Sequence, residues 1–261
     1  MKTRMKSSIA GVLILTALMA LGSCQKETPG TNGYQYTNVI QVANDGTTTF
    51  IENNLKMLLA GSATLTDTLA ASLIKIREEE KLARDVYAVV GRTWNNQVFQ
   101  RISTAENNHL TAVITLMRSA GLTDTALEAE GIFTGSGMQA MYDSLVSQGE
   151  ASFQEACQAG ARIEEMDIND LSRALLNTSD SNATLVLENL LRGSRNHLRA
   201  FNRQLAALGY TYTPVYISQD EFDQIVNSPM EQGQRYRFRG RGGNHGNCQG
   251  NMPGYGNGFG M

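Results

Sequence analysis

The sequence predicts an all-α protein in which four long helices share one core and a long connection joins the second helix to the third. Four stretches repeat apolar residues at spacings of three and four, which gathers them on one face of a helix. Short links make the first two and the last two stretches antiparallel neighbours, whereas about 30 residues separate the second from the third. With 41% hydrophobic residues among 261, the chain can bury one such core and still carry tails.

Local signals place the ends of these helices. Glycine favours the left-handed conformation that ends a helix, so Gly91, Gly121 and Gly209 mark three C-termini. Ser152 and Glu155 have the spacing of a capping box and open the third helix. The predicted long helices are residues 67–90, 98–120, 152–176 and 183–208, with shorter helices over 138–146 and 218–226 and a hairpin around "NDG" within 36–51.

The N-terminus has the pattern of an export signal. Lys2, Arg4 and Lys6 precede an apolar run over residues 9–21, which is shorter than a typical membrane span. The run ends in "LGSC", which resembles the bacterial lipobox, where the chain is cut before the cysteine and the cysteine receives a lipid. We therefore predict an exported lipoprotein, anchored by Cys24 to the bacterial cell envelope on its periplasmic or outer side. A plain signal peptide with an incidental cysteine is the alternative.

Composition divides the chain into four parts. Residues 1–23 form the signal peptide and residues 24–64 a polar tether with an N-terminal extension. Residues 65–228 form the helical domain, and residues 229–261 a disordered tail rich in Gly and Arg. The stretch "RYRFRGRGG" in the tail resembles arginine–glycine RNA-binding segments. A net charge of −3 and the predicted export nevertheless argue against nucleic acid as a partner.

In the first helix the stretch "EEEKLARDVY" carries three adjacent glutamates. Glu80 is the only charged member of the apolar stripe, and Glu79 lies on the flank of that stripe. Glu78 falls on the solvent side, together with Lys81 and Asp85. Since burying a bare carboxylate is costly, Glu80 needs a partner in the core.

The other three helices carry polar residues in matching registers. The second helix presents Glu106 and His109 one turn apart on its apolar face. The third presents Glu164, while Glu165 falls on the solvent face of that helix. The fourth presents His197, preceded by a serine one turn earlier. Every long helix is therefore expected to direct a polar side chain into the core.

Taken singly, each of these residues has an ordinary explanation. A lone histidine on an apolar face is usually a satisfied core residue, and a lone glutamate could pair with Arg84 or Arg195. Three carboxylates and two imidazoles that converge from four helices instead match a di-metal site for hard or borderline ions. The cations would offset the cost of burying the carboxylates. The candidate ligands are Glu80, Glu106, His109, Glu164 and His197.

These residues resemble the di-iron core of the ferritin-like superfamily, which includes rubrerythrins and bacterioferritins. The resemblance rests on "E-x6-Y" at Glu80 and Tyr87 and on "F-x2-I-x3-E-x2-H" from Phe99 to His109, and it covers residues 65–228. The runs "EEEKLARDVY" and "NLLRGSRNHLRAF" look closer to an uncharacterised bacterial branch of that superfamily. The resemblance implies a ferritin-like four-helix bundle with one long crossover and one or two ions of iron or manganese at the candidate ligands. It also implies that Tyr87 lies beside the metals or is active in redox chemistry.

One departure from that pattern concerns the fourth helix, where Ser194 stands in the place of the glutamate of Glu-x-x-His. The site is therefore expected to hold two ions, one ion or none. Two functions follow. In the first, the chain is an envelope protein for redox chemistry or metal handling, with an oxidoreductase of the di-iron type as its possible activity. In the second, it is a metal-free structural or interaction lipoprotein with a hydrogen-bonded polar core. The expected partners are the membrane, through the lipid, and metal ions, and a homodimer stays open.

Overall fold

The computed structural model of the chain describes residues 34–37, 40–42, 48–59, 65–231 and 236–239. Internal contacts set residues 36–238 apart as one compact unit, which contains all the helices below. Its described residues are mainly helical, so the prediction of an all-α core is confirmed. Among the described helices, none combines the length and apolar character needed to cross a membrane. The predicted signal peptide and Cys24 lie outside the described residues.

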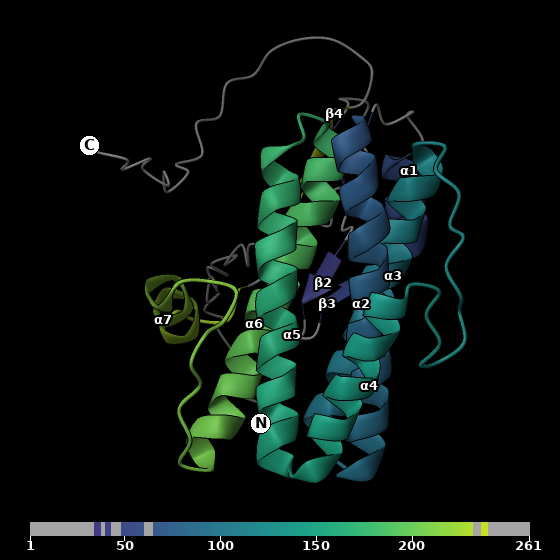
Figure 1. Cartoon of the computed structure of the whole chain (residues 1–261). Coiled ribbons are helices and arrows are strands. Elements are labelled where there is room, and N and C mark those ends of the chain that lie inside the picture. The colour runs from purple at the N-terminus through teal and green to yellow at the C-terminus, as the bar shows by residue number, and fades with distance from the viewer. Residues whose placement is uncertain (1–33, 38–39, 43–47, 60–64, 232–235, 240–261) are drawn as a thin grey trace, which may run out of the picture. The chain divides into compact units, whose positions relative to one another are not determined.

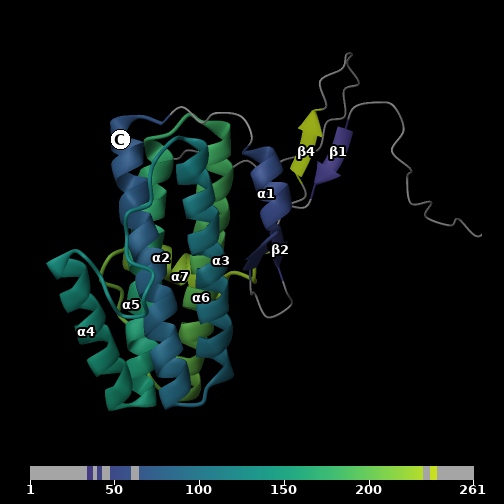
Figure 2. The same cartoon turned by 90° about the vertical axis from the view of Figure 1, so that its right-hand side faces the viewer.

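Four long helices form the main part of this unit: α2 (Asp67–Thr93), α3 (Gln97–Ser119), α5 (Phe153–Leu176) and α6 (Ser181–Ala207). They lie side by side, as the two views in Figures 1 and 2 show. α2 packs against α3 and α5, and α6 packs against the same two helices. In Figure 1 the chain descends through α2 and α6 and ascends through α3 and α5, so each packed pair is antiparallel.

Two of the three glycines predicted to end helices do so. Gly121 and Gly209 have φ angles of +76° and +80°, in the left-handed region that favours glycine. The prediction for Gly91 is wrong, because α2 continues to Thr93 and Asn95 takes the left-handed conformation, with a φ of 45°. A Cβ at Gly91 would lie 3.3 Å from the Cβ of Phe99, so this glycine instead permits close approach of α3.

The predicted cap by Ser152 is present, and Ser218 caps a second helix. Ser152 accepts a hydrogen bond of 3.1 Å from the backbone N–H of Glu155 at the start of α5. Ser218 accepts one of 3.2 Å from the backbone N–H of Glu221 and opens α7 (Gln219–Asn227). Both bonds satisfy a backbone donor that the first turn of a helix leaves without a partner.

The shorter helices and the strands agree with the predictions in part. α4 (Ser136–Ala151) lies in the long connection between α3 and α5 and is longer than the predicted 138–146. α1 (Glu52–Leu58) was not predicted, and its Leu55 is fully buried in the core. The predicted hairpin is confirmed by the antiparallel pairing of β2 and β3, with Ile40 opposite Phe50. The strands are β1 (Tyr34–Thr37), β2 (Ile40–Val42), β3 (Thr48–Phe50) and β4 (Tyr236–Arg239).

The buried apolar residues form two clusters at different levels of the long helices. One cluster contains the rings of Tyr87, Phe99 and Phe201, whose centroids lie 5.1–6.0 Å apart. The other contains Leu73 on α2 and Leu116 on α3. Along α2 and α3, the polar residues of the predicted site fall between the parts that belong to the two clusters. Apolar packing therefore flanks that site on both sides.

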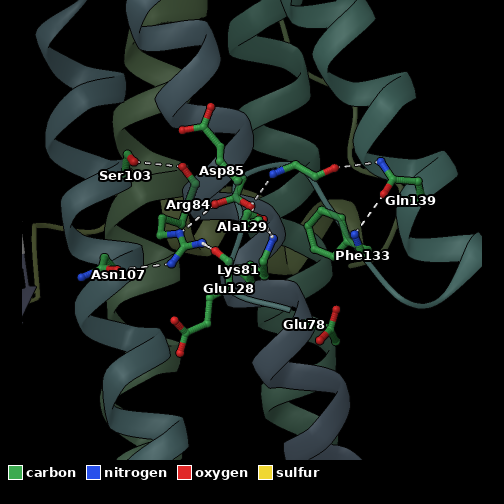
Figure 3. A network of polar contacts seen from close by, with 12 residues as sticks. Glu78, Lys81, Arg84, Asp85, Ser103, Asn107, Glu128, Ala129, Phe133 and Gln139 are labelled. Carbon is green, nitrogen blue, oxygen red and sulfur yellow. Dashed lines mark hydrogen bonds and ion pairs between the residues drawn. The ribbon is translucent and has the colours of Figure 1, made fainter. Parts of the chain in front are cut away.

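A buried charge pair holds the connection between α3 and α4 against α2 (Figure 3). The Lys81 ammonium lies 2.6 Å from Oδ2 of Asp85, donates to the Ala129 carbonyl at 2.8 Å and lies 3.9 Å from the Phe133 ring centroid. Oδ2 of Asp85 also accepts from the Gly131 N–H at 2.9 Å. The prediction that Lys81 and Asp85 face solvent is wrong, because this connection covers that face of α2.

Two other carboxylates of the long helices are buried as well. Glu165 was predicted on a solvent face, but it accepts hydrogen bonds from the Tyr212 hydroxyl and, at 2.9 Å, from the backbone N–H of Val215. The segment after α6 covers this face of α5, which the register of one helix does not reveal. Glu79, predicted on the flank of its stripe, is buried and lies 3.1 Å from the Lys75 ammonium.

Candidate metal centre

The four long helices bring the predicted ligands into one buried region. Each of these side chains is at most 3% exposed. The ligand atoms of three of them all lie within 4.8 Å of one another, namely those of Glu106, His109 and His197. The predicted set comprises Glu80 on α2, Glu106 and His109 on α3, Glu164 on α5 and His197 on α6.

Glu106 lies between the two imidazoles. Its Oε2 is 2.7 Å from Nδ1 of His109, and its Oε1 is 2.7 Å from Nδ1 of His197. The two imidazole rings stack, with centroids 5.5 Å apart and planes inclined by 26°. Glu106 and the two imidazoles are therefore residues that would hold a cation if the contacts between them opened to admit one.

Glu80 and Glu164 flank this group on either side. Oε2 of Glu80 lies 3.4 Å from Nδ1 of His109, and Oε2 of Glu164 lies 3.5 Å from Nδ1 of His197. Within the described residues, neither oxygen of Glu80 nor Oε2 of Glu164 has a hydrogen-bond partner. The Tyr87 hydroxyl donates to the other oxygen of Glu164, Oε1, at 2.6 Å. Three buried carboxylate oxygens are thus available to a ligand.

Burial and mutual charge determine the protonation of the centre. Burial opposes ionisation of Glu106, but the imidazoles of His197 and His109 hold the pKa of its carboxyl far below the ordinary value. Burial would lower the pKa of His109, yet the charges of Glu106 and Glu80 raise it to about 9. Burial raises the pKa of Glu80 to about 8 and that of Glu164 to about 7. Without a cation, protons therefore occupy part of this donor set at neutral pH.

Asp167 on α5 is a further buried carboxylate that the sequence reasoning missed. It is 2% exposed, and its Oδ2 has no hydrogen-bond partner in the described part of the chain. Burial and the charges of Glu80 and Glu164 raise the pKa of its carboxyl well above the ordinary value. The available signal was its position three residues after Glu164, the same spacing as in the Glu-x-x-His of α3. The stripe followed along α5 passed instead through Ile168.

Ser194 does not supply a ligand from the fourth long helix. Its hydroxyl is buried and donates a hydrogen bond of 3.2 Å to the Leu190 carbonyl, one turn earlier in α6. The side chain is thus turned back to the backbone of its own helix. Position 194 of α6 therefore directs no carboxylate toward the candidate ligands.

The two arginines considered as partners for core glutamates pair elsewhere. Nε of Arg84 lies 2.7 Å from Oδ1 of Asp85, in the network of Figure 3. Arg195 forms a two-pronged contact with Glu231, at 2.7 Å and 2.5 Å. Both contacts leave the candidate ligands to interact with one another and with Tyr87.

Comparison with known proteins identifies the family. Residues 70–229 match the family model described as "Uncharacterized protein domain (DUF2202)". "Uncharacterized protein MJ0754" of Methanocaldococcus jannaschii is 41% identical over 162 residues, which are 62% of this chain and 88% of that protein. The crystal structure of hypothetical protein MJ0754 from Methanococcus jannaschii matches with a TM-score of 0.62 and 39% identity, over 64% of this chain and 96% of that one. The match to the family model includes all the candidate ligands, and the chain belongs to the DUF2202 domain family.

Proposed function

We propose that the chain is a ferritin-like four-helix bundle that binds iron or manganese at its centre for redox chemistry or metal handling. Its topology supports this proposal, since α2 with α3 and α5 with α6 form antiparallel pairs, and the long connection containing α4 joins them. The observation that carries the proposal is the convergence of buried carboxylates and imidazoles from all four long helices. The proposed ligands are Glu80, Glu106, His109, Glu164 and His197.

The donor set fits such ions. Carboxylate oxygens suit hard cations, and imidazole nitrogens suit iron and other first-row metals. Both oxygens of Glu80, Oε2 of Glu164 and Nε2 of His197 are buried without a hydrogen-bond partner within the described residues. Each such atom costs about 1–3 kcal/mol, which a bound cation would offset. A bound iron or manganese ion would supply redox and Lewis-acid chemistry.

Within this proposal, Tyr87 holds a proton next to the centre. Burial and the charge of Glu164 raise the pKa of its hydroxyl well above the ordinary value, so the phenol stays protonated and donates to Glu164. The rings of Phe99 and Phe201 pack against Tyr87 and exclude water from that side. The reaction class that we propose is oxidoreduction, with oxygen or peroxide as the oxidant.

For the location, we propose export and attachment to the cell envelope through a lipid on Cys24. The support is the basic and apolar pattern that ends in "LGSC". Expression of the full chain and of Cys24→Ser, followed by separation of membrane and soluble fractions, tests it. We expect the parent chain in the membrane fraction and the variant in the soluble fraction. Identical partition of both chains would favour a plain signal peptide.

A metal-free structural role is the second candidate function. Glu106 is paired with both imidazoles at 2.7 Å, and Tyr87 satisfies one oxygen of Glu164. A polar cluster of this kind can fix the register of four helices without a metal. This role would suit an interaction protein of the envelope.

Metal analysis of the purified full chain separates these two functions. The chain is loaded with Fe²⁺ or Mn²⁺, desalted and measured by mass spectrometry, alongside Glu106→Ala and His109→Ala. Thr104→Ala, an exposed position on the same helix, is the matched control. We expect bound metal in the parent and the control and loss in both centre variants. A parent chain that resists loading with either ion would leave only the structural role.

A further inference from the structure

The proposed ligands leave the centre one carboxylate short of a balanced pair of ions. Glu80, Glu106 and Glu164 carry three negative charges when ionised, whereas two divalent cations carry four positive charges. Di-metal bundles of this type use four carboxylates with two imidazoles. An uncompensated charge in a buried apolar setting is costly. The fourth carboxylate would ordinarily come from the position of Ser194, whose hydroxyl is bound to its own helix.

Asp167 is a buried acid without an assigned role. It is 98% removed from solvent, and its Oδ2 finds no hydrogen-bond donor in the described residues. The carboxyl of Asp167 lies close enough to the acids of the centre that their negative charges oppose its ionisation. These acids are Glu80, Glu164, Glu79 and Glu106. A buried carboxylate so surrounded needs either a proton or a cation.

The helix geometry puts Asp167 at the level of Ser194. α5 and α6 are antiparallel, and the contact of 3.5 Å between Glu164 and His197 fixes their relative height. Asp167 lies three residues after Glu164, and Ser194 lies three residues before His197. Each step rises about 4.5 Å along its helix, and because the helices run in opposite directions both steps lead the same way.

Contacts between α2 and α5 place Asp167 at the same level along the bundle by a second route. The Tyr87 hydroxyl lies 2.6 Å from Oε1 of Glu164, and the Lys75 ammonium lies 2.5 Å from Oδ2 of Asp170. Asp167 lies midway between Glu164 and Asp170 on α5. The corresponding midpoint between Lys75 and Tyr87 on α2 is residue 81, next to Glu80. Asp167 and Ser194 thus both belong to the level of Glu80.

We propose that Asp167 supplies from α5 the carboxylate that α6 lacks at position 194, and that it thereby completes a centre for two divalent ions. This inference rests on the proposed metal-binding function. The four carboxylates are then Glu80, Glu106, Glu164 and Asp167, which balance two divalent cations while both histidines bind as neutral imidazoles. The hydroxyl of Ser194 is turned toward the Leu190 carbonyl, so position 194 directs no carboxylate to the centre.

The number of bound ions tests this inference. The full chain is stripped with chelator, saturated with Mn²⁺ and measured for metal per protein by equilibrium dialysis. We expect two ions in the parent and one in Asp167→Asn, which keeps the shape of the side chain but removes its charge. Asp170→Asn is the matched control, because it removes an acid one turn further along α5 that pairs with Lys75. We expect two ions in this control.

Moving the carboxylate from position 167 to position 194 gives a second test by the number of bound ions. We expect the double variant Asp167→Asn with Ser194→Glu to regain two ions, because the carboxylate returns to α6. This double variant also decides the matter if Asp167→Asn alone loses helix content by circular dichroism.

Each other outcome points to a distinct failure. Two ions in both the parent and Asp167→Asn, or one ion in the parent, would overturn the role of Asp167 and leave metal binding intact. One ion in the double variant would also overturn it. A parent chain without Mn²⁺ or Fe²⁺ would remove the proposed function itself, and this inference with it.

Discussion

The Tyr87 hydroxyl on α2 donates a hydrogen bond of 2.6 Å to Oε1 of Glu164 on α5, inside the core. The same hydroxyl lies 3.2 Å from the Gly160 carbonyl. This contact joins two long helices and occupies one oxygen of Glu164, while the other oxygen lies 3.5 Å from Nδ1 of His197. Tyr87 therefore fixes one oxygen of Glu164 and leaves the other directed toward His197.

Tyr87→Phe should lower the free energy of unfolding by about 1.5–3 kcal/mol, the usual range for a hydrogen bond to a charged group. The ring packing against Phe99 and Phe201 would be kept, so the helix content should not change. Urea denaturation of the chelated protein at about pH 8.5, where the Glu164 carboxyl with its pKa of about 7 is ionised, measures the loss. Tyr210→Phe, at an exposed position, is the control and should be neutral. Equal stability of both variants would show that the Tyr87 bond contributes nothing.

Glu106→Gln should lower the pKa of both histidines of the centre in the metal-free protein. The charge of Glu106 is the largest influence that raises the pKa of His109 to about 9, and burial acts in the opposite direction. Without that charge, burial should dominate and favour the neutral imidazole. Titration of the histidine ring signals by NMR measures the change, with Glu128→Gln as an exposed control. A His109 pKa that stays near 9 in Glu106→Gln would contradict the pairing.

Stability of the metal-free protein should fall as the pH rises from 6.5 to 9. His109, with its pKa raised from 6.5 to about 9, contributes stability that is complete below pH 6.5 and is lost as the pH passes 9. Glu80, with its pKa raised from 4.5 to about 8, adds a penalty that grows over pH 4.5–8. In this window the folded chain binds protons that the unfolded chain has released. Each such proton changes the stability by at most about 1.4 kcal/mol per pH unit.

Metal should reverse this trend, because ions displace those protons and bind more tightly as the pH rises. Melting temperatures recorded in chelator and in excess Mn²⁺ between pH 6 and 9 measure both effects. A flat profile in chelator would show that the centre carries no excess protons. A metal effect that shrinks as the pH rises would speak against carboxylate and imidazole ligands.

Asp85→Asn should cost about 3–5 kcal/mol of stability, because it leaves the Lys81 ammonium buried without its counter-charge. Arg92→Gln breaks the exposed pair with Glu130, which also joins α2 to the long connection, and should cost at most about 1 kcal/mol. Lys81→Met in the Asp85→Asn background should recover much of the loss. Guanidinium denaturation gives all three values. Similar costs for Asp85→Asn and Arg92→Gln would mean that the connection does not shield this pair.

Helical register predicted correctly that Glu80, Glu106 and His109 point into the core. A stripe with a period of 3.6 residues identifies the face of a helix that meets the other long helices. Such a stripe cannot identify faces that are covered by segments remote in sequence. The burial of Lys81 under the connection before α4, and of Glu165 under the segment after α6, was therefore not foreseen.

Two further differences between the prediction and the structure, at Gly91 and at Asp167, have causes in the local structure. Gly91 was taken as the end of α2, but the left-handed position is occupied by Asn95, a residue type that tolerates it. Asp167 escaped notice because it lies beside the stripe of α5 and not on it. Its burial follows from the packing of α2 on α5, which a single helix pattern does not specify.

The most direct test of the metal centre is anomalous X-ray diffraction from crystals of the full chain grown with Mn²⁺. We predict two anomalous peaks in the core, one beside His109 and one beside His197. The surrounding oxygens should come from Glu80, Glu106, Glu164 and Asp167. Ordered side chains at these positions with no anomalous peak between them would contradict metal binding at this centre.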